Sequence, residues 1–402
     1  MKGITSQLLF ALLLSVFMTS CDDRAPLSLS LDSIQETKVS PLKREAIFPL
    51  FVQSVGGHYN LDPILTQYVK RIASRIISSS THRNIAFNFV IVNHSKPFAI
   101  AFPGYNIALS RSLFTIIENE AELAAVLAQK AIASTKLSSH PLPNEENLSN
   151  MLCNSLEFTI ESIIQSQRLT LATECKIDTE VLDLLTLLGY DPKALSTFYN
   201  KIKKKDLESF LPYLSKKMQS ISVQMPELEY SGYLGKKGYI ETVLSLIENE
   251  PAYDILQQSL NAYADTNYEQ ALALAKQASK QVPNEALFHL QIGRSYWRLK
   301  KESLAIKAFT SAIHYNPLYY YPYFERGKLF DSRQKSFRAK SDYEMATEYF
   351  PSDKTLYHYG NLLFKINEKK EAMEAYEKVA TFNSDYSEKA RKKVARYKSR
   401  CT

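Results

Sequence analysis

The sequence predicts a mainly α-helical protein, in which an α+β domain with a small sheet is followed by an α-solenoid. Only 11 of the 402 residues are glycine, which disfavours an all-β fold. Pro283, Pro317 and Pro351 recur every 34 residues, a period typical of stacked helix pairs. Residues 85–92 alternate in polarity and are rich in branched side chains, as a strand requires.

The overall charge excludes little by itself. The hydrophobic fraction is 45%, the charged fraction is 23% and the formal net charge is +7, as in an ordinary globular protein. We find no nucleic-acid-binding motif, so no nucleic-acid partner is expected. One basic run stands at the C-terminus: Lys389, Arg391, Lys392, Lys393, Arg396, Lys398 and Arg400. We interpret it as a solvated helix face; contact with an anionic lipid or an acidic partner is the alternative.

The N-terminus has the pattern of a bacterial lipoprotein. After Lys2, residues 8–17 form an apolar run that is too short to span a bilayer and is typical of a signal peptide. The run ends in Met-Thr-Ser-Cys, which resembles a lipobox with cleavage before Cys21. We therefore predict a signal peptide over residues 1–20, lipidation of Cys21, a tether over 21–40 and attachment to the periplasmic face of a bacterial membrane. The alternative is an exported protein with a chance cysteine.

The first domain is predicted to extend over residues 41–225. Two helices are expected between Pro41 and Ser79, the second capped by Asp62 with Pro63 at its first position. The strand at 85–92 follows, and then two short strands around a Pro-Gly turn within 98–111.

A helix at residues 118–133 carries the most informative motif. Its sequence, ENEAELAAVLAQKAIA, resembles the active-site helix of the BepA/HtpX-type zinc metallopeptidases, in which NEAELAAVLA leads directly into H-E-x-x-H. Gln129 then stands at the first His, Lys130 at the catalytic Glu and Ala133 at the second His. In that motif two imidazoles on one helix face bind zinc, and the Glu acts as general base. An amide, an ammonium and a methyl group cannot replace them.

The resemblance also locates the other site positions. Gly189-Tyr190-Asp191-Pro192 matches a turn of the family, and counting back from it places Lys176 at the third ligand and retains Asp178 in the second shell. Leu214 stands where the family has a late active-site His. We expect Lys130 and Lys176 to point into the degenerate site, where a bridge to Asp178 or Glu174 could replace the metal structurally. The alternative is that both lysines reach solvent. No metal and no cofactor are expected.

The resemblance further implies a substrate-binding strand. In the family, the segment that matches residues 98–111 ends in a strand at the edge of the substrate cleft. A free strand edge can hold an extended peptide without catalysis. Tyr105, Ile107, Ala108 and Leu109 are the candidate peptide-binding edge; a covered edge without a ligand is the alternative.

The C-terminal part is predicted to be an array of tetratricopeptide repeats. A helical connector is expected over residues 226–250, the repeats over 251–386 and a polar capping helix over 387–402. The small and aromatic positions of this repeat recur around two of the prolines. Around Pro317 they are Gly293, Tyr296, Ala305, Phe309 and Ala312, and around Pro351 they are Gly327, Phe330, Ala339, Tyr343 and Ala346. Most of these aromatic side chains are expected to be core.

Such arrays bind protein partners or client polypeptides. The run of residues 319–324 is too aromatic to be entirely core, and nearby arginines could supply polar contacts. The candidate partner-binding residues are Arg294, Arg298, Tyr320, Tyr323 and Arg326.

Two cysteines of the first domain, Cys153 and Cys175, could pair in the cell envelope, although buried free thiols are the favoured interpretation.

The resemblance implies a factor in the assembly of outer-membrane or other envelope proteins. We predict a catalytically inactive, lipid-anchored scaffold or chaperone. A zinc metalloendopeptidase with unusual ligands and a plain interaction adaptor are the two alternatives.

Overall fold

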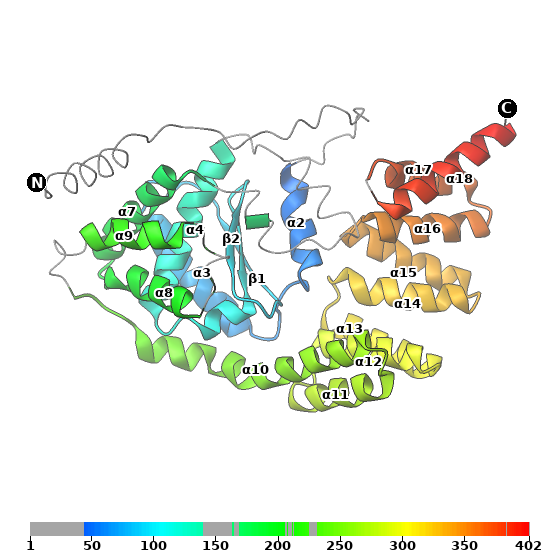
Figure 1. Ribbon diagram of the computed structural model, residues 1–402, viewed down its shortest axis with the longest axis horizontal. Helices are drawn as coiled ribbons and strands as arrows, with labels where there is room; N and C mark the ends of the chain where they lie inside the picture. Colours follow the sequence, from blue (N-terminus) through cyan, green and yellow to red (C-terminus); the bar gives the residue numbers. More distant parts are fainter. Residues whose placement is uncertain are drawn as a thin grey trace, which may run out of the picture. The chain divides into compact units, whose positions relative to one another are not determined.

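The computed structural model describes residues 44–139, 163–164, 169–205, 207, 211, 213–224, 231–382 and 384–401. The expected signal peptide, Cys21, the tether and Cys153 lie outside these residues. Val39–Thr402 forms one compact unit. Within its described part, the prediction of a mainly helical chain with one small sheet is confirmed (Figure 1). None of the described helices is both long enough and apolar enough to cross a bilayer.

Helices α2 (Arg44–Ser54) and α3 (Pro63–Ser78) open the first domain, as predicted. The Asp62 carboxylate accepts a hydrogen bond from the Leu65 backbone N–H at 2.9 Å, and Pro63 occupies the first turn, where no N–H is needed. The apolar side of α3 faces the core, since residues such as Leu65 and Val69 are fully buried.

The sheet corrects one prediction. Strands β1 (Asn88–Val92), β2 (Ala99–Phe102) and β3 (Asn106–Ser110) are arranged in the order β1-β3-β2. β3 pairs parallel with β1 and antiparallel with β2, so it is the central strand. The prediction that Tyr105, Ile107, Ala108 and Leu109 form a free edge is therefore wrong. Both edges of β3 are hydrogen-bonded, and a third strand cannot be added.

Helix α4 (Glu120–Ser139) lies at the centre of the first domain. It contacts α3, the strands β2 and β3, and the later helices α7 (Leu171–Leu187) and α8 (Lys193–Lys204). Residues 121–128 of α4 are all buried, which its alanine-rich sequence permits because small side chains let neighbouring elements approach closely. The 3₁₀ helix η1 (Arg111–Thr115) precedes α4, and α9 (Leu214–Gln224) packs against α7 and α8.

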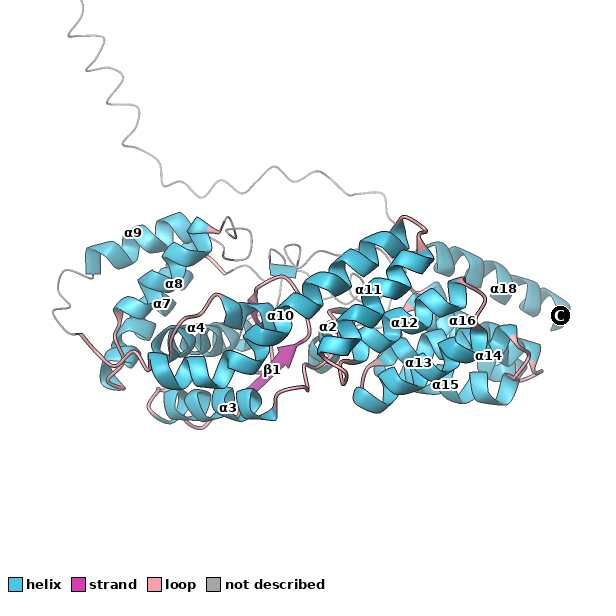
Figure 2. Ribbon diagram, turned by 90° about the horizontal axis from the view of Figure 1, so that it is seen from below, coloured by secondary structure: helices cyan, strands magenta, loops and turns pink. Residues whose placement is uncertain are grey.

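The C-terminal helices form successive antiparallel pairs (Figures 1 and 2). In order they are α10 (Lys236–Ala264), α11 (Tyr268–Gln281), α12 (Ala286–Arg298), α13 (Glu302–Tyr315), α14 (Tyr320–Ser332), α15 (Ser336–Tyr349), α16 (Asp353–Lys365), α17 (Lys369–Ala380) and α18 (Asp385–Cys401). α10 continues through Pro251 and pairs with α11, so the expected connector and the first repeat share one helix.

The repeat glycines are explained by close packing of the two helices of a pair. A Cβ atom placed on Gly293 would lie 2.6 Å from the Phe309 ring, and one on Gly327 would lie 3.0 Å from the Tyr343 ring. These aromatic rings are buried, as predicted. The small residue on the first helix thus makes room for the aromatic ring on the second.

Hydrogen bonds join the first domain to the repeat array. The Gln53 side chain of α2 donates to the Leu318 carbonyl at 2.7 Å and accepts from the Tyr320 N–H at 3.0 Å. Asn60 donates to the Tyr315 carbonyl at 2.8 Å, and Asn316 donates to the His58 carbonyl at 3.2 Å.

Candidate functional site

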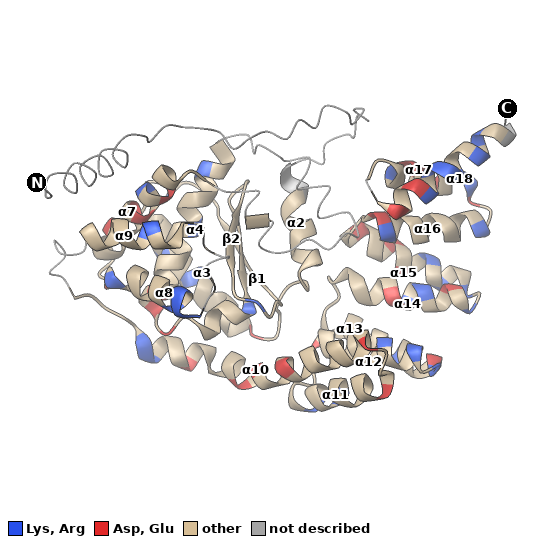
Figure 3. Cartoon of the chain, viewed as in Figure 1, with Lys and Arg blue, Asp and Glu red and all other residues tan. Residues whose placement is uncertain are grey.

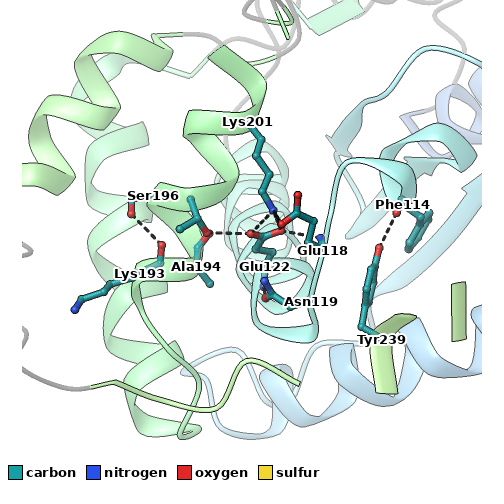
Figure 4. A network of polar contacts seen from close by, with 10 residues as sticks. Phe114, Glu118, Asn119, Glu122, Lys193, Ala194, Ser196, Lys201 and Tyr239 are labelled. Atoms are coloured by element: carbon teal, nitrogen blue, oxygen red, sulfur yellow. Dashed lines mark hydrogen bonds and ion pairs between the residues drawn. The ribbon is translucent and has the colours of Figure 1, made fainter. Parts of the chain in front are cut away.

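The N-terminus of α4 is anchored by a reciprocal cap and by a buried ion pair (Figure 4). The Asn119 side chain accepts from the Glu122 N–H at 2.9 Å, and the Glu122 carboxylate accepts from the Glu118 N–H at 2.9 Å. Glu122 is 1% exposed, and the Lys201 ammonium of α8 binds its two carboxylate oxygens at 2.6 and 2.8 Å. These contacts fix α4 against α8 and thereby position the next turns of α4.

Gln129 faces α7 and α8 from the middle of α4. Its side-chain amide donates to the Asp178 carboxylate of α7 at 3.0 Å and to the Tyr199 hydroxyl of α8. The Tyr199 hydroxyl donates in turn to the same Asp178 oxygen at 2.8 Å. Gln129, Asp178 and Tyr199 are all buried. The amide thus acts as a hydrogen-bond donor within a closed network, and its NH₂ group is directed at the carboxylate.

A lysine that sequence reasoning missed completes the cluster. Lys217 of α9 is 0% exposed, and its ammonium lies 2.7 Å from the Glu174 carboxylate and 3.2 Å from the Asp178 carboxylate. The sequence feature that could have indicated a buried lysine is the spacing of Glu174 and Asp178. Residues four apart share one face of a helix, so two carboxylates on α7 require a cation opposite them.

The assignment of Lys176 is corrected by the same spacing. Lys176 lies two residues from Asp178 and is exposed, so the prediction that it points into the site is wrong. Glu174 takes that position. Ala133 and Leu214 are buried, and neither carries a polar side-chain atom. The expected lysine bridge to Asp178 and Glu174 exists, but Lys217 forms it.

Lys130 lies next to this cluster without an ion pair to any described carboxylate. Burial lowers the pKa of Lys130, Glu174 and Asp178 raise it, and the neighbouring Lys217 ammonium lowers it, so that the resulting pKa is about 8. Lys130 and Gln129 line a pocket of about 20 Å³ together with residues of the β2 end, including Phe98 and Ala99. That volume holds roughly one water molecule and no peptide.

Burial also raises the pKa of Asp178 above its ordinary value, although Lys217, Gln129 and Tyr199 all act to lower it. One oxygen of Asp178, Oδ2, has no hydrogen-bond partner among the described residues. The charge balance of the cluster therefore depends on Lys217.

The donor set does not fit zinc. The two positions that the sequence resemblance assigns to imidazoles carry an amide and a methyl group, and the carboxylates of Glu174 and Asp178 already bind an ammonium ion. Zinc prefers imidazole, thiolate or a free carboxylate in a tetrahedral arrangement. Over the described residues, no group of three His, Cys, Asp or Glu side chains could hold a metal ion. Cys175 of α7 is a half-buried free thiol and lies outside this network.

The predicted partner-binding residues of the array are mostly engaged within the chain. Tyr323 is 9% exposed, and Tyr320 binds Gln53 of the first domain through its backbone. Arg326 forms two hydrogen bonds with the Asp342 carboxylate, at 2.9 and 2.7 Å. Arg298 is exposed and Arg294 is half-buried, so the prediction stays open for these two arginines alone.

Comparisons with known proteins agree with this architecture. Residues 63–129 match the model of Peptidase family M48, and residues 256–319 and 353–386 match models of the tetratricopeptide repeat. The beta-barrel assembly-enhancing protease of Escherichia coli (strain K12) is 28% identical over 174 residues, which are 38% of this chain and 36% of that protein. The Yersinia pestis protein of the same name is 27% identical over 161 residues, 35% and 33% of the two chains.

Among solved structures, a crystal structure of MamA aligns with a TM-score of 0.31 and 19% identity, over 39% of this chain and 91% of that one. The alignments with the two beta-barrel assembly-enhancing proteases cover about a third of the length of those proteins. The chain thus combines a peptidase family M48 domain with tetratricopeptide repeats and is homologous to the beta-barrel assembly-enhancing proteases.

Proposed function

We propose that this protein has a peptidase-like fold without catalytic activity and that it binds polypeptides during the assembly of envelope proteins. The observation that carries the proposal is the position of Lys217. Its buried ammonium binds Glu174 and Asp178 at 2.7 and 3.2 Å, where the resemblance places the zinc site. A fixed internal cation can stabilise two carboxylates as a metal does, but it cannot activate water.

The residues that would move protons support the same proposal. Lys130 stands at the position of the general base. An amine with a pKa of about 8 is mostly protonated near neutral pH and cannot take a proton in that form. Ala133 offers no ligand atom, and the Gln129 amide directs its NH₂ group at Asp178. These three residues supply neither a zinc ligand nor an unprotonated general base at the positions that the resemblance assigns to the H-E-x-x-H motif.

The setting in the cell envelope rests on the relatives and on the N-terminus. Two curated relatives of this chain are named for enhancing β-barrel assembly. The apolar run before Cys21 supports export and lipid anchoring on the periplasmic face of a bacterial membrane. In this proposal the repeat array supplies the binding surface, and the first domain provides a rigid support joined to it through Gln53, Asn60 and Asn316.

The test mixes the purified full chain with a β-barrel outer-membrane protein diluted from urea. The Escherichia coli beta-barrel assembly-enhancing protease serves as the positive control for cleavage. We expect the barrel protein to co-elute with this chain on gel filtration and to remain full length on a gel. Chelator-sensitive fragments would establish instead a metallopeptidase with unusual ligands. A failure to co-elute under conditions in which the control protein binds would remove the polypeptide-binding role.

A further inference from the structure

One face of the repeat array carries cations and aromatic rings in alternation. These side chains come from the first helix of successive pairs and from α18, and together we call them the basic–aromatic face: Tyr263, Arg294, Trp297, Tyr321, Phe324, Lys328, Lys354, Tyr357, Tyr386 and Lys393. Figure 3 marks the lysines and arginines on these helices. The side chains form contacts across the helix boundaries, which place them on a single continuous face.

At the start of this face, Arg294 of α12 lies between two rings. Its guanidinium carbon is 4.5 Å from the Tyr263 ring centre of α10 and 5.6 Å from the Tyr321 ring centre of α14. Such stacking holds the planar guanidinium in place and leaves its N–H groups available. Its one hydrogen bond to a described side chain is a weak one, to Gln291 at 3.4 Å.

The same alternation continues toward the C-terminus. The Lys328 ammonium is 4.9 Å from the Trp297 ring centre of the preceding pair, and the Lys354 ammonium is 5.5 Å from the Phe324 ring centre. The Lys393 ammonium of α18 is 5.8 Å from the Tyr357 ring centre of α16. Each cation thus bridges from its own helix to a ring on the neighbouring helix.

Carboxylates on this face are few. Glu325 is 5% exposed and pairs with Lys328 at 3.4 Å, and Asp331 pairs with Lys365 at 2.8 Å. Among the described residues, no carboxylate forms an ion pair with Arg294, Lys354 or Lys393. Glu325 acts on Arg294 and Lys354 only at longer range, so the cations of the face outnumber the carboxylates that pair with them.

The titration behaviour of the face agrees with that charge excess. Burial lowers the pKa of Lys354, and Lys328 and Arg294 act in the same direction, while Glu325 and Asp353 oppose them. Burial, Lys328 and Lys354 together lower the pKa of His358 to about 4, so this side chain stays neutral near neutral pH. An anion bound at this face would relieve the repulsion between these cations.

A pocket of about 220 Å³ ends the face at α18. Phe364, Tyr376, Lys393, Arg396 and Tyr397 line it. Its walls are three aromatic rings, and two cations stand within it. This volume is large enough for one aromatic side chain, and the cations favour a carboxylate beside that ring.

We propose that the basic–aromatic face binds an extended, acidic polypeptide segment, with carboxylates on Arg294, Lys354 and Lys393 and an aromatic side chain in the pocket of α16–α18. The proposal deepens the function proposed above, because it gives the chemistry of the polypeptide that the array binds.

The test uses fluorescence polarisation with the purified full chain. The probe is a labelled peptide of alternating Glu and Gly residues that ends in Phe, and its partner probe replaces every Glu with Gln. We expect the acidic probe to bind at least roughly tenfold more tightly than the amide probe, since an ionised acceptor strengthens each contact. Its affinity should also fall as salt is added.

The variant Lys354→Gln/Lys393→Gln removes two cations that have no ion pair with a described carboxylate, so the fold should be retained, as circular dichroism would verify. We expect the affinity for the acidic probe to fall roughly tenfold or more. The matched control, Lys307→Gln/Lys370→Gln, removes two exposed lysines of α13 and α17 and has the same net charge. Its affinity should stay within about twofold of the parent protein.

Equal binding of both probes, or equal losses in the two double variants, would overturn the acidic-segment proposal and leave the proposed function intact. Binding that depends on charge but is lost when the terminal Phe is replaced by Gly supports the pocket assignment. Tight binding to vesicles of anionic lipid that is lost in Lys354→Gln/Lys393→Gln, together with no binding of the acidic probe, would show that the face binds a membrane instead.

Discussion

Replacement of Lys217 by Met tests directly whether its ammonium stabilises the buried carboxylates of Glu174 and Asp178 in the first domain. Met keeps most of the side-chain volume and removes the charge. Asp178 and Glu174 would then stay behind with side chains that are 1% and 14% exposed. Removing one partner of a buried ion pair typically costs about 3–5 kcal/mol, because the remaining charge is uncompensated. That cost is a large part of the roughly 5–15 kcal/mol that stabilises a domain.

The assay is urea unfolding followed by far-ultraviolet circular dichroism. The only tryptophan, Trp297, lies in the array, so its fluorescence reports local unfolding of the array, whereas circular dichroism reports the helices of both parts. We expect Lys217→Met to lower the urea midpoint of the circular dichroism transition and to change the midpoint of the fluorescence transition less. Lys216→Met, an exposed neighbour on α9, is the matched control and should change stability by less than about 0.5 kcal/mol.

The pH dependence gives the sign of the effect. Asp178 already has a raised pKa, and loss of Lys217 raises it further. Protonation of Asp178 removes the uncompensated charge, so the deficit of Lys217→Met should shrink as the pH falls through that raised value. Addition of Glu174→Gln and Asp178→Asn to Lys217→Met should recover most of the loss. A Lys217→Met protein as stable as Lys216→Met would refute the electrostatic reasoning.

Three further predictions concern the array and its junction. Gly327→Ala should destabilise the array by about 1–3 kcal/mol in thermal melts, because the new Cβ would lie 3.0 Å from the Tyr343 ring. Gly238→Ala should instead stabilise the protein by up to about 1 kcal/mol, because its Cβ would meet no atom within 4 Å. The parent protein should lose roughly 2 kcal/mol of unfolding free energy as the pH falls from 6.5 to about 4, because the folded state resists protonation of His358. The variant His358→Gln should not show this loss, which parallel urea titrations at the two pH values would measure. Gln53→Ala should speed hydrogen exchange around Tyr320 and cost about 1–2 kcal/mol; unchanged exchange would contradict the junction.

Local sequence patterns predicted the helical elements well. The Asp62 cap, the pair of strands around Pro103 and the repeat glycines each depend on contacts within a few residues or within one repeat, and the structure confirms them. The position of β3 depends on pairing with β1, which lies earlier in the chain, and no local pattern distinguishes a central strand from an edge strand when both are apolar.

The candidate site was predictable only in part. The prediction that Gln129 and Ala133 replace two histidines follows from the sequence, because the helix resembles a known motif up to Ala128. Lys217 was missed because it comes from α9 and meets Glu174 and Asp178 only through tertiary packing. A count of i, i+4 carboxylates on α7 would have selected Glu174 in place of Lys176. The partner of those carboxylates still required the fold.

The metal content of the purified full chain tests the central claim most directly, because the claim is that the Lys217 ammonium occupies the role of the metal at Glu174 and Asp178. Elemental analysis after dialysis against zinc should be run beside a casein-cleavage assay with and without a chelator. The account predicts no stoichiometric zinc and no cleavage. Stoichiometric zinc that is retained through dialysis, with cleavage that a chelator abolishes, would contradict it.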